Sequence, residues 1–419
     1  MKAVFFTLGT RGDVQPYVAL ARGLISKGHQ VVICTGETFR GFIEENGIAF
    51  YPATADLMAI LESEEGRAVF AGGGFNFFKM LKYSKEVVTP AYRKTMDDFF
   101  IASKGADVII YHPKALGAVD IAAYHNIPCV SMPPVPITYP VTEFPNLAMF
   151  PKKNLGATLN KLTYQPIRLA EKPYIKGINA FREKSLGFGK RKAGDLTYYS
   201  KGKEIPIVYP ISPYLFQNVK SWNGHVYLPG FFYLDIKEVE LDHGLRDFLA
   251  AGTKPIVISF SSMPLKDPDA FKDKLIQALR KTNNRGVVLT GVSGMTFDED
   301  KTIYSIDKAP HRLIFKEAMG IVHHGGMGTA AEGLLSGVPQ LIMPFSVDQP
   351  FWAQRLYDQG YALAPLNQKK LKVSDLVAAF EKMADAEVIQ RAEAIMAVIK
   401  AENGVEQGVR FIEELVQKN

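Results

Sequence analysis

The sequence predicts an α/β fold with two doubly wound parallel sheets, and three observations support this prediction. Short apolar runs of strand length alternate with helical segments near the N-terminus, and the same alternation restarts at Pro255. The chain has 419 residues, enough for two domains of about 200 residues each. Apolar residues make up 47% and charged residues 22% of the chain, the composition of an ordinary globular protein.

The N-terminal half opens with a β-α-β unit. Residues 2–8 form an apolar run that predicts a strand, and the loop 9–15 follows it. Pro16 suits the first turn of a helix whose apolar residues recur at helical spacing, and Gly28 ends that helix. Further elements are expected at 30–34 (strand), 39–46 (helix), 48–51 (strand), 107–111 (strand), 115–125 (helix), 128–132 (strand), 155–185 (helical) and 205–209 (strand).

A linker rich in Gly and aromatic residues is expected at 221–235. We therefore place the first domain at 1–220, the linker region at 221–245 and the second domain at 246–399. In the second domain the pattern predicts strands at 255–259, 286–290, 320–323 and 340–343, and helices at 270–281, 329–335, 373–384 and 386–418.

The stretch 320–352 contains the candidate anion site. Three glycines, Gly325, Gly326 and Gly328, allow a sharp turn between a strand and a helix. The N-terminus of such a helix offers unpaired N–H groups and the positive end of its dipole, which suit a phosphate. His324 at the strand end and Thr329 in the first helical turn add donors to this site.

Polar residues further along the same stretch suit sugar hydroxyls. Glu332 lies one helical turn after the glycines, at the right reach for a ribose diol, and Asp348 and Gln349 follow the next strand at the ligand-binding edge of such sheets. Each residue also has a purely structural interpretation: a solvated helix face for Glu332, a loop for Asp348 and Gln349, and a strand-end core residue for His324. The joint spacing favours a nucleotide-sugar site.

A second candidate site lies in the first domain. Asp13 follows the first strand, where ligands bind in an open α/β sheet, although Asp also suits a helix cap or a loop turn. His112 stands at the end of another strand. Phe75 and Phe78 follow a glycine run and favour either an aromatic lid over a ligand or an ordinary loop with core aromatics.

These motifs resemble those of the UDP-glycosyltransferase superfamily of GT-B glycosyltransferases. The segment from His324 to Glu332 and the run PFSVDQPFW resemble its donor-binding signature, and GTRGDVQP resembles the first loop of the sterol and antibiotic glycosyltransferase branch. The resemblance implies two Rossmann-like domains facing across a cleft, with the acceptor in the first and the donor in the second. It also implies that a last helix, at about 400–419, packs back on the first domain.

The resemblance also assigns roles to individual residues. Asp13 would be the general base, and His112 and Tyr139, with Phe75 and Phe78, would line the acceptor site. The implied donor-binding residues are Ser262, His311, His324, Gly326, Gly328, Thr329, Glu332, Asp348 and Gln349. Among these, Ser262, His324 and Thr329 would hold the diphosphate. Glu332 would bind the ribose, and Asp348 with Gln349 would bind the hexose.

The implied reaction is an inverting transfer of a hexose, with glucose as the default, from a UDP-sugar to a hydroxyl of a lipophilic acceptor such as a sterol. The UDP-sugar is a co-substrate, and neither a cofactor nor a metal is expected. Asp267 and Asp269 are better explained by helix capping, and Asp298 to Asp300 by a solvated loop, than by metal binding. Two alternatives remain: a sugar-nucleotide epimerase of the same fold, and a non-catalytic protein that binds lipid or nucleotide-sugar.

Charge is unevenly distributed along the chain. The net charge is +6, but residues 152–203 carry thirteen Lys or Arg and three acids, a net charge near +10. This segment indicates either a solvated helical surface or a peripheral contact with anionic membrane lipids. Nucleic acid is not expected, because no recognition motif is present.

The sequence predicts a cytoplasmic protein, with a peripheral position on the inner membrane face as the alternative. Cys34 and Cys129 lie in apolar runs and are expected to be core thiols of a reducing compartment. The N-terminal apolar run is too short for a signal peptide, and no run approaches the roughly 18 apolar residues of a membrane span.

Overall fold

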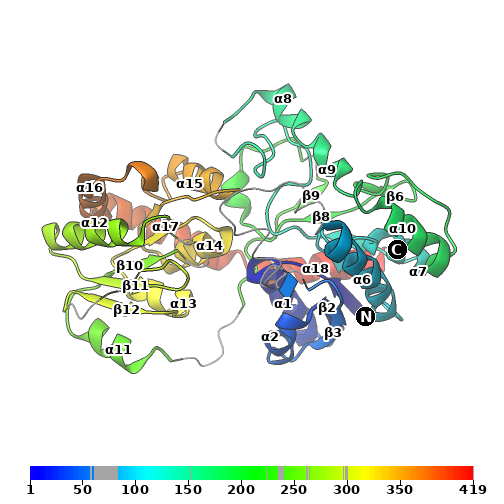
Figure 1. Ribbon diagram of the computed structural model, residues 1–419, viewed down its shortest axis with the longest axis horizontal. Coiled ribbons are helices and arrows are strands. Elements are labelled where there is room, and N and C mark those ends of the chain that lie inside the picture. The colour runs from blue at the N-terminus through cyan, green and yellow to red at the C-terminus, as the bar shows by residue number, and fades with distance from the viewer. Residues whose placement is uncertain are drawn as a thin grey trace. The chain divides into compact units, whose positions relative to one another are not determined.

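The chain folds into two compact units, which Figure 1 shows as a ribbon of the computed structural model. One unit comprises Met1–Asn146, Leu155–Asp235 and Asn403–Asn419, and the other comprises Leu147–Asn154 and Ile236–Glu402. The structure describes residues 1–56, 59–60, 84–151, 153–222, 224–234, 240–260, 263, 265–295, 297 and 301–418.

The first unit is built on a seven-stranded parallel sheet with the strand order β3-β2-β1-β4-β5-β8-β9. Its strands are β1 (Lys2–Phe6), β2 (Gln30–Gly36), β3 (Ala49–Ala53), β4 (Val108–Tyr111), β5 (Cys129–Ser131), β8 (Ile207–Val208) and β9 (Val226–Tyr227). Its helices include α1 (Arg11–Ser26), α2 (Arg40–Glu44), α6 (Thr89–Ala102), α7 (Ala118–His125), α8 (Ala157–Leu162), α9 (Gln165–Leu169), α10 (Ile175–Phe181) and α18 (Gly404–Gln417). The order reverses direction after β1, which is the doubly wound arrangement that the sequence predicts.

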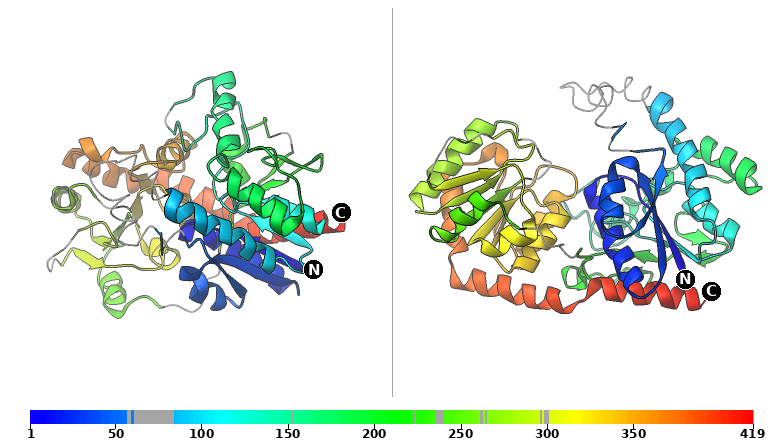
Figure 2. Two further views of the ribbon diagram at one scale, coloured as in Figure 1. Left: turned by 45° about the vertical axis from the view of Figure 1, so that its right-hand side comes forward. Right: turned by 90° about the horizontal axis from the view of Figure 1, so that it is seen from below.

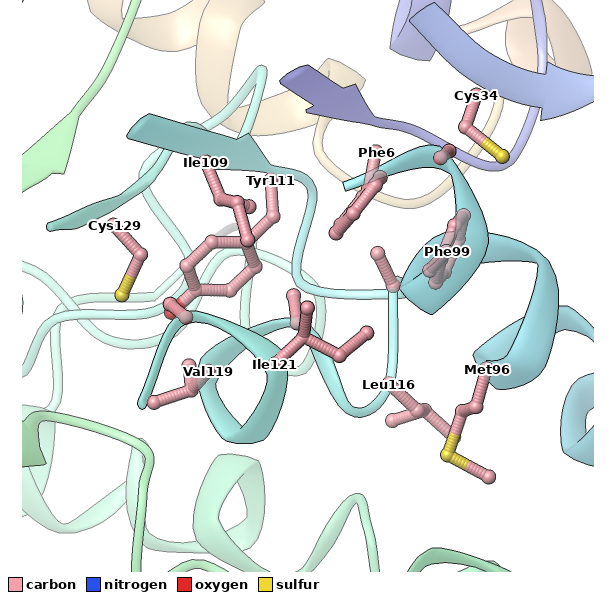
Figure 3. Packing of buried hydrophobic residues seen from close by; sticks show 14 of the residues in the cluster. Phe6, Cys34, Met96, Phe99, Ile109, Tyr111, Leu116, Val119, Ile121 and Cys129 are labelled. Atoms are coloured by element: carbon pink, nitrogen blue, oxygen red, sulfur yellow. The ribbon is translucent and has the colours of Figure 1, made fainter. Parts of the chain in front are cut away.

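Both faces of this sheet are buried, because successive side chains of a strand point to opposite faces. Phe5 joins the core cluster that contains residues of α1 and α18. Phe6 joins the opposite cluster, where its ring stacks on Phe99 of α6 with the centroids 4.3 Å apart (Figure 3). Cys34 and Cys129 lie in this second cluster as buried, unbonded thiols, which confirms their prediction as core residues.

Helix α18 packs against α1 within the first unit (Figure 2). Its buried residues Val409 and Ile412 join the same core cluster as Val18 and Leu24 of α1. The expected single helix at 386–418 is divided in two, because Asn403 adopts a left-handed conformation with φ of 51° between α17 (Ala386–Ala401) and α18. This break lies at the boundary between the two units.

Other elements of the first unit also differ from the sequence prediction. Helix α1 begins at Arg11, within the expected loop 9–15, so Pro16 lies inside the helix rather than in its first turn. Helix α7 begins at Ala118 rather than 115, because Gly117 adopts a φ of 82° just before it. The expected helical stretch 155–185 contains three short α-helices, α8, α9 and α10, rather than a continuous one. Val226–Tyr227, expected in the linker, forms β9, whose pairing with Ile207–Val208 adds it to the sheet.

The second unit contains a five-stranded parallel sheet with the order β12-β11-β10-β13-β14. Its strands are β10 (Ile256–Ser259), β11 (Gly286–Leu289), β12 (Ile303–Ile306), β13 (Gly320–His323) and β14 (Gln340–Ile342). Its helices are α11 (His243–Ala250), α12 (Pro268–Lys281), α13 (His311–Ile314), α14 (Met327–Ser336), α15 (Gln349–Asp358), α16 (Val373–Met383) and α17, among the described residues. Core clusters lie on both faces of this sheet too, so the predicted α/β class with two doubly wound sheets is confirmed.

Of the two expectations about acidic segments, one can be compared with the structure directly. Asp267 is the N-cap of α12 and accepts a hydrogen bond from the backbone N–H of Ala270 at 3.0 Å, as the capping interpretation predicts. Asp298 to Asp300 lie outside the described residues. Within the part of the chain that the structure describes, no helix is both long and apolar enough to span a membrane.

The basic segment 152–203 is only partly a surface feature. Asp120 of α7 is fully buried and pairs with both Arg182 and Arg191, with a distance of 3.1 Å to Arg191 Nη2. Arg191 also makes two hydrogen bonds, 2.6 and 2.8 Å long, with the carboxylate of Glu171. Two of the thirteen cations therefore serve the interior of the unit, because a buried carboxylate needs charged partners.

We predict that Asp120→Asn destabilises the protein by about 3–5 kcal/mol, because it removes the buried carboxylate that pairs with Arg182 and leaves Arg191 with Glu171 as its remaining carboxylate partner. Urea unfolding would measure this change. The matched control is Glu183→Gln, which removes a partner from Lys190 at 3.7 Å on the surface and should cost less than about 1 kcal/mol. Equal losses in the two variants would show that the buried pairs contribute no more than a surface pair.

Candidate functional site

The carboxylate of Asp13 has three neighbouring residues in the first unit. Asp13 lies in the first turn of α1, where its Oδ2 accepts hydrogen bonds from the backbone N–H and the hydroxyl of Thr10, at 2.7 and 3.2 Å. His112 Nε2 lies 3.1 Å from Oδ1, and Lys114 Nζ lies 3.1 Å from Oδ2. Asp13 thus performs the capping role considered for it and also forms a charged cluster.

The sheet brings this cluster together. Strands β1 and β4 are paired in parallel, so the loops that follow them leave the same edge of the sheet. Gly9 adopts a φ of 142°, and a Cβ added there would lie 2.1 Å from Asp13 Oδ2 and 2.8 Å from Lys114 Nζ. Any larger residue would displace the carboxylate and the ammonium, so Gly9 is a structural requirement of the cluster.

The hydrogen bonds around His112 indicate its tautomer. The backbone N–H of Lys114 donates to Nδ1 at 3.0 Å, so in the neutral ring Nε2 carries the proton and is the atom near Asp13. The Nε2 atom lies in close contact with Oδ1 of the carboxylate, at 3.1 Å. Burial lowers the pKa of His112 below its usual value, against the opposing effect of Asp13, so the ring is neutral at physiological pH.

Asp13 is held in its ionised form. Burial alone would raise its pKa, but the contact with His112, the charge of Lys114 and the backbone N–H of Thr10 outweigh burial, and the pKa lies well below its usual range. The side chain of Asp13 is not sealed off, since 14% of it is exposed to solvent. The cluster therefore presents an ionised carboxylate that an incoming hydroxyl can reach.

Tyr139 lies in a different group of aromatic residues of the same unit. Its backbone N–H donates to the hydroxyl of Tyr209 at 3.1 Å, and its ring lies near those of Tyr198 and His225, with centroid distances of 5.8 and 5.7 Å. These contacts do not link Tyr139 to Asp13. Three other predicted site residues, Phe75, Phe78 and Ser262, lie outside the described residues.

The glycine turn of the second unit has the predicted geometry. Strand β13 ends at His323, Gly325 turns the chain with a φ of 88°, and α14 begins at Met327. Thr329 is buried in the first turn of this helix. The first N–H groups of an α-helix have no partner within it, so this turn can bind an anion.

His324 is placed beside that turn. Its ring lies against Gly326, where an added Cβ would be 2.4 Å from Nε2. Its Nδ1 is buried and has no hydrogen-bond partner among the described residues. Burial lowers the pKa of His324 to about 4, so the ring is a neutral donor and acceptor at physiological pH. A buried polar atom without a partner costs about 1–3 kcal/mol, and a ligand would remove this cost.

His311 supports the same edge of the sheet through its side chain. Its Nε2 lies 2.9 Å from the Ser259 hydroxyl at the end of β10, and its ring stacks on Phe315 with a centroid distance of 4.6 Å. Burial, with a smaller contribution from His324, lowers the pKa of His311 to about 4. The neutral side chain thus bridges β10 and α13.

The three predicted sugar-binding side chains are held by protein groups. Glu332 forms a bidentate pair with Arg312, with N–O distances of 2.5 and 2.7 Å. Asp348 Oδ2 accepts a hydrogen bond from the indole N–H of Trp352 at 2.7 Å. Gln349 Oε1 accepts from the backbone N–H groups of Phe345 and Ser346, at 2.8 and 3.2 Å.

Sequence reasoning missed the partners of these residues: Thr10, Lys114, Arg312 and Trp352. Only two had a signal in the sequence. Thr10 stands three residues before Asp13, the spacing of a capping box, and Trp352 stands four residues after Asp348, one helical turn away. Lys114 and Arg312 meet their carboxylates only through the tertiary fold.

Comparisons with known proteins agree with this architecture. Residues 3–108 match the glycosyltransferase family 28 N-terminal domain, and residues 300–405 match the erythromycin biosynthesis protein CIII-like C-terminal domain. The solved structure of the glycotransferase of kitacinnamycin superposes with a TM-score of 0.71 at 19% identity, covering 99% of this chain and 98% of that one. The fold is therefore the GT-B fold of glycosyltransferases.

Two sterol 3-beta-glucosyltransferases of Arabidopsis thaliana, UGT80A2 and UGT80B1, are similar to almost the whole chain. They are 33% and 30% identical to it, over 98% of this chain and over 65% and 67% of their own lengths. The chain belongs to the family of glycosyltransferase enzymes that contains these sterol 3-beta-glucosyltransferases. It spans about two thirds of the length of these two relatives.

We predict that Gly326→Ala weakens the binding of UDP at least tenfold, or by about 1.4 kcal/mol. The φ of −62° at Gly326 suits alanine, but the new methyl group would push the ring of His324 away from the turn. Calorimetric titration with UDP would measure the affinity.

The control for this prediction is a double-mutant cycle with His324→Ala. Removing the imidazole makes room for the methyl group, so Gly326→Ala should have little further effect in the His324→Ala background. Additive losses would show that Gly326 acts on nucleotide binding independently of His324.

Proposed function

We propose that this protein transfers a hexose, with glucose as the first candidate, from a UDP-sugar to a hydroxyl of a lipophilic acceptor of the sterol class, with inversion at the anomeric carbon. The observation that carries the proposal is the ionised Asp13 carboxylate at the edge formed by β1 and β4. The similarity to two sterol 3-beta-glucosyltransferases supports the acceptor class and the donor sugar.

In the second unit, different residues would bind the diphosphate, the ribose and the hexose of the UDP-sugar. The N-terminus of α14 with Thr329 and His324 would hold the diphosphate. Glu332 would accept from the ribose hydroxyls, because a carboxylate paired with one arginine retains acceptor capacity. Asp348 and Gln349 would bind neighbouring hydroxyls of the hexose. Preorganised donors at the diphosphate would stabilise the charge that grows on the departing UDP, so the proposal includes no metal or cofactor.

In the acceptor half, Asp13 would act as general base. It takes the proton of the acceptor hydroxyl as the oxygen forms its bond to the anomeric carbon, and the bond from that carbon to the phosphate oxygen breaks with its electrons on UDP. Attack from the face opposite UDP inverts the configuration. His112 would hold Asp13 in place without taking the proton itself, because its Nε2 already carries one.

We expect release of UDP from UDP-glucose to depend on a sterol acceptor presented in detergent micelles. Asp13→Asn should lower the transfer rate by about 10²–10⁴-fold while UDP affinity is unchanged, because only the proton acceptor is lost. A coupled assay of UDP release measures the rate, and calorimetry measures the affinity. Asp375→Asn is the matched control, since Asp375 holds the same capping-box position in α16 and should leave transfer unchanged.

Each other outcome of this assay contradicts a defined part of the proposal. Wild-type transfer by Asp13→Asn would refute the base assignment. Conversion of UDP-glucose without an acceptor would indicate an epimerase. Binding of UDP without turnover on any acceptor would indicate a binding protein.

We predict that Lys114→Met moves the acid limb of the pH profile of kcat/KM to higher pH. Lys114 helps to lower the pKa of Asp13, so its removal raises that pKa and more of the base becomes protonated as the pH falls. Lys27→Met, the same change of charge at the exposed far end of α1, is the control and should leave the acid limb in place. If the wild type, Lys114→Met and Lys27→Met all have the same acid limb, then Lys114 does not influence the pKa of Asp13.

A further inference from the structure

His323, the last residue of β13, is a second histidine beside the glycine turn. Its side chain is fully buried and makes two hydrogen bonds within the second unit. The Nδ1 atom accepts from the backbone N–H of Gly325 at 3.1 Å, and the Nε2 atom lies 3.1 Å from Oε1 of Gln340. The ring therefore connects the glycine turn to the first residue of β14.

These two hydrogen bonds determine the tautomer of the ring. A backbone N–H can only donate, so Nδ1 of His323 is the acceptor, and Nε2 carries the proton that Gln340 accepts. Burial lowers the pKa of His323 to about 3, so the ring is neutral at physiological pH and keeps this tautomer. The N–H of Gly325 thus has a fixed acceptor inside the protein.

The packing of α14 leaves room for this connection. A Cβ added at Gly333 of α14 would lie 2.2 Å from Oε1 of Gln340, so a larger residue there would displace the amide. Gln340 is only 2% exposed, so its amide meets the ring away from water. His323 is therefore held at both ring nitrogens, and its orientation fixes the direction of the Gly325 N–H.

The turn that His323 holds leads directly into the N-terminus of α14. The carbonyl of Gly326 accepts the first helical hydrogen bond, from the N–H of Ala330 at 2.9 Å, so the N–H groups of residues 327–329 have no partner within the helix. Because Gly325 donates to His323, its own N–H determines the shape of the turn. The direction in which residues 327–329 present their N–H groups follows from that shape.

We propose that His323 is a positioning residue for the diphosphate of the nucleotide-sugar: by accepting from Gly325, it fixes the turn that directs the N–H groups of residues 327–329 at the diphosphate. The inference rests on the proposed function, which places the diphosphate at this helix. Both ring nitrogens of His323 are occupied by protein groups, so the residue acts on the ligand through Gly325. Donors that are fixed beforehand favour binding, because the ligand does not have to order them.

Two replacements of His323 separate the roles of its two nitrogens. Asparagine places an amide oxygen near the position of Nδ1 and keeps an acceptor for Gly325, whereas glutamine reaches the position of Nε2 and keeps only the bond to Gln340. We expect His323→Gln to weaken UDP binding at least tenfold and to change uridine binding little, because uridine has no phosphates. His323→Asn should keep the ratio of the two affinities close to that of the wild type. Calorimetry measures the UDP affinity, and ligand-observed NMR measures the weaker uridine affinity.

Gln340→Met tests the same connection from its other end and leaves His323 in place. Loss of the acceptor for Nε2 frees the ring to turn away from Gly325, so the ratio of UDP affinity to uridine affinity should fall. In the His323→Asn background the ratio should fall no further, because asparagine makes no bond to Gln340. Thermal unfolding shows whether each variant is folded, and Gln340→Met tests the inference even if His323→Gln does not fold.

Three results would overturn the inference: equal losses of UDP and uridine affinity in His323→Gln, equal effects of His323→Gln and His323→Asn, or an unchanged affinity ratio in Gln340→Met. A wild type that binds UDP no more tightly than uridine would instead contradict the proposed function, and with it the assignment of the diphosphate to α14. A wild type that binds UDP tightly but transfers no sugar would contradict the proposed transfer and leave the positioning role of His323 intact.

Discussion

Parallel pairing of the strands is the constraint on which both candidate sites depend. In the first unit β1 and β4 pair in register from Ala3 with Val108 to Phe6 with Tyr111, so the loops after them leave one edge together. This brings Lys114 to Asp13 across 101 residues of sequence. In the second unit the pairing of β13 with β14 does the same for His324 and the loop before Asp348. The order of the strands therefore determines which side chains that are distant in sequence lie close enough to form one site.

Within the first unit, charge opposes burial at the Asp13 carboxylate. Burial disfavours the ionised form, whereas the neighbouring His112, the cation of Lys114 and the N–H of Thr10 favour it and together prevail. The carboxylate is therefore ready to accept a proton at any physiological pH, but it is a weak base while these partners surround it. Movement of Lys114, whose side chain is 44% exposed, would strengthen the base without changing the backbone.

The sequence was sufficient to predict the fold class, because buried parallel strands appear as apolar runs and helices as periodic segments. It placed His112 and His324 at strand ends for the same reason, whereas Asp13, expected in the loop 9–15, lies in the first turn of α1. Strand β9 was missed because two residues, Val226 and Tyr227, are too few to show a period. The start of α7 was misplaced because the left-handed conformation of Gly117 depends on its surroundings.

Charge was the property that the sequence predicted least well. A local count cannot separate Arg182 and Arg191, which pair with the buried Asp120, from cations at the surface such as Lys161. The count therefore indicated a uniform basic segment, where the structure has a buried ion cluster in one part and exposed cations in another. Burial of the partner decides between these roles, and burial is a property of the tertiary fold.

A residue assigned to the donor sugar can hold its own loop in place and still bind a ligand, because it uses different atoms for the two contacts. Gln349 uses its carbonyl oxygen to hold the loop, and its amide N–H groups are the part that can donate to a sugar hydroxyl. Between this loop and Asp348, Val347 adopts a φ of 55°, which is costly for a β-branched residue, by about 1–3 kcal/mol. The bonds to Gln349 and the bond from Trp352 to Asp348 fix the loop on both sides of this strained residue. A loop held in this way needs little ordering when a ligand arrives, so the strain and the internal hydrogen bonds together favour a preorganised site.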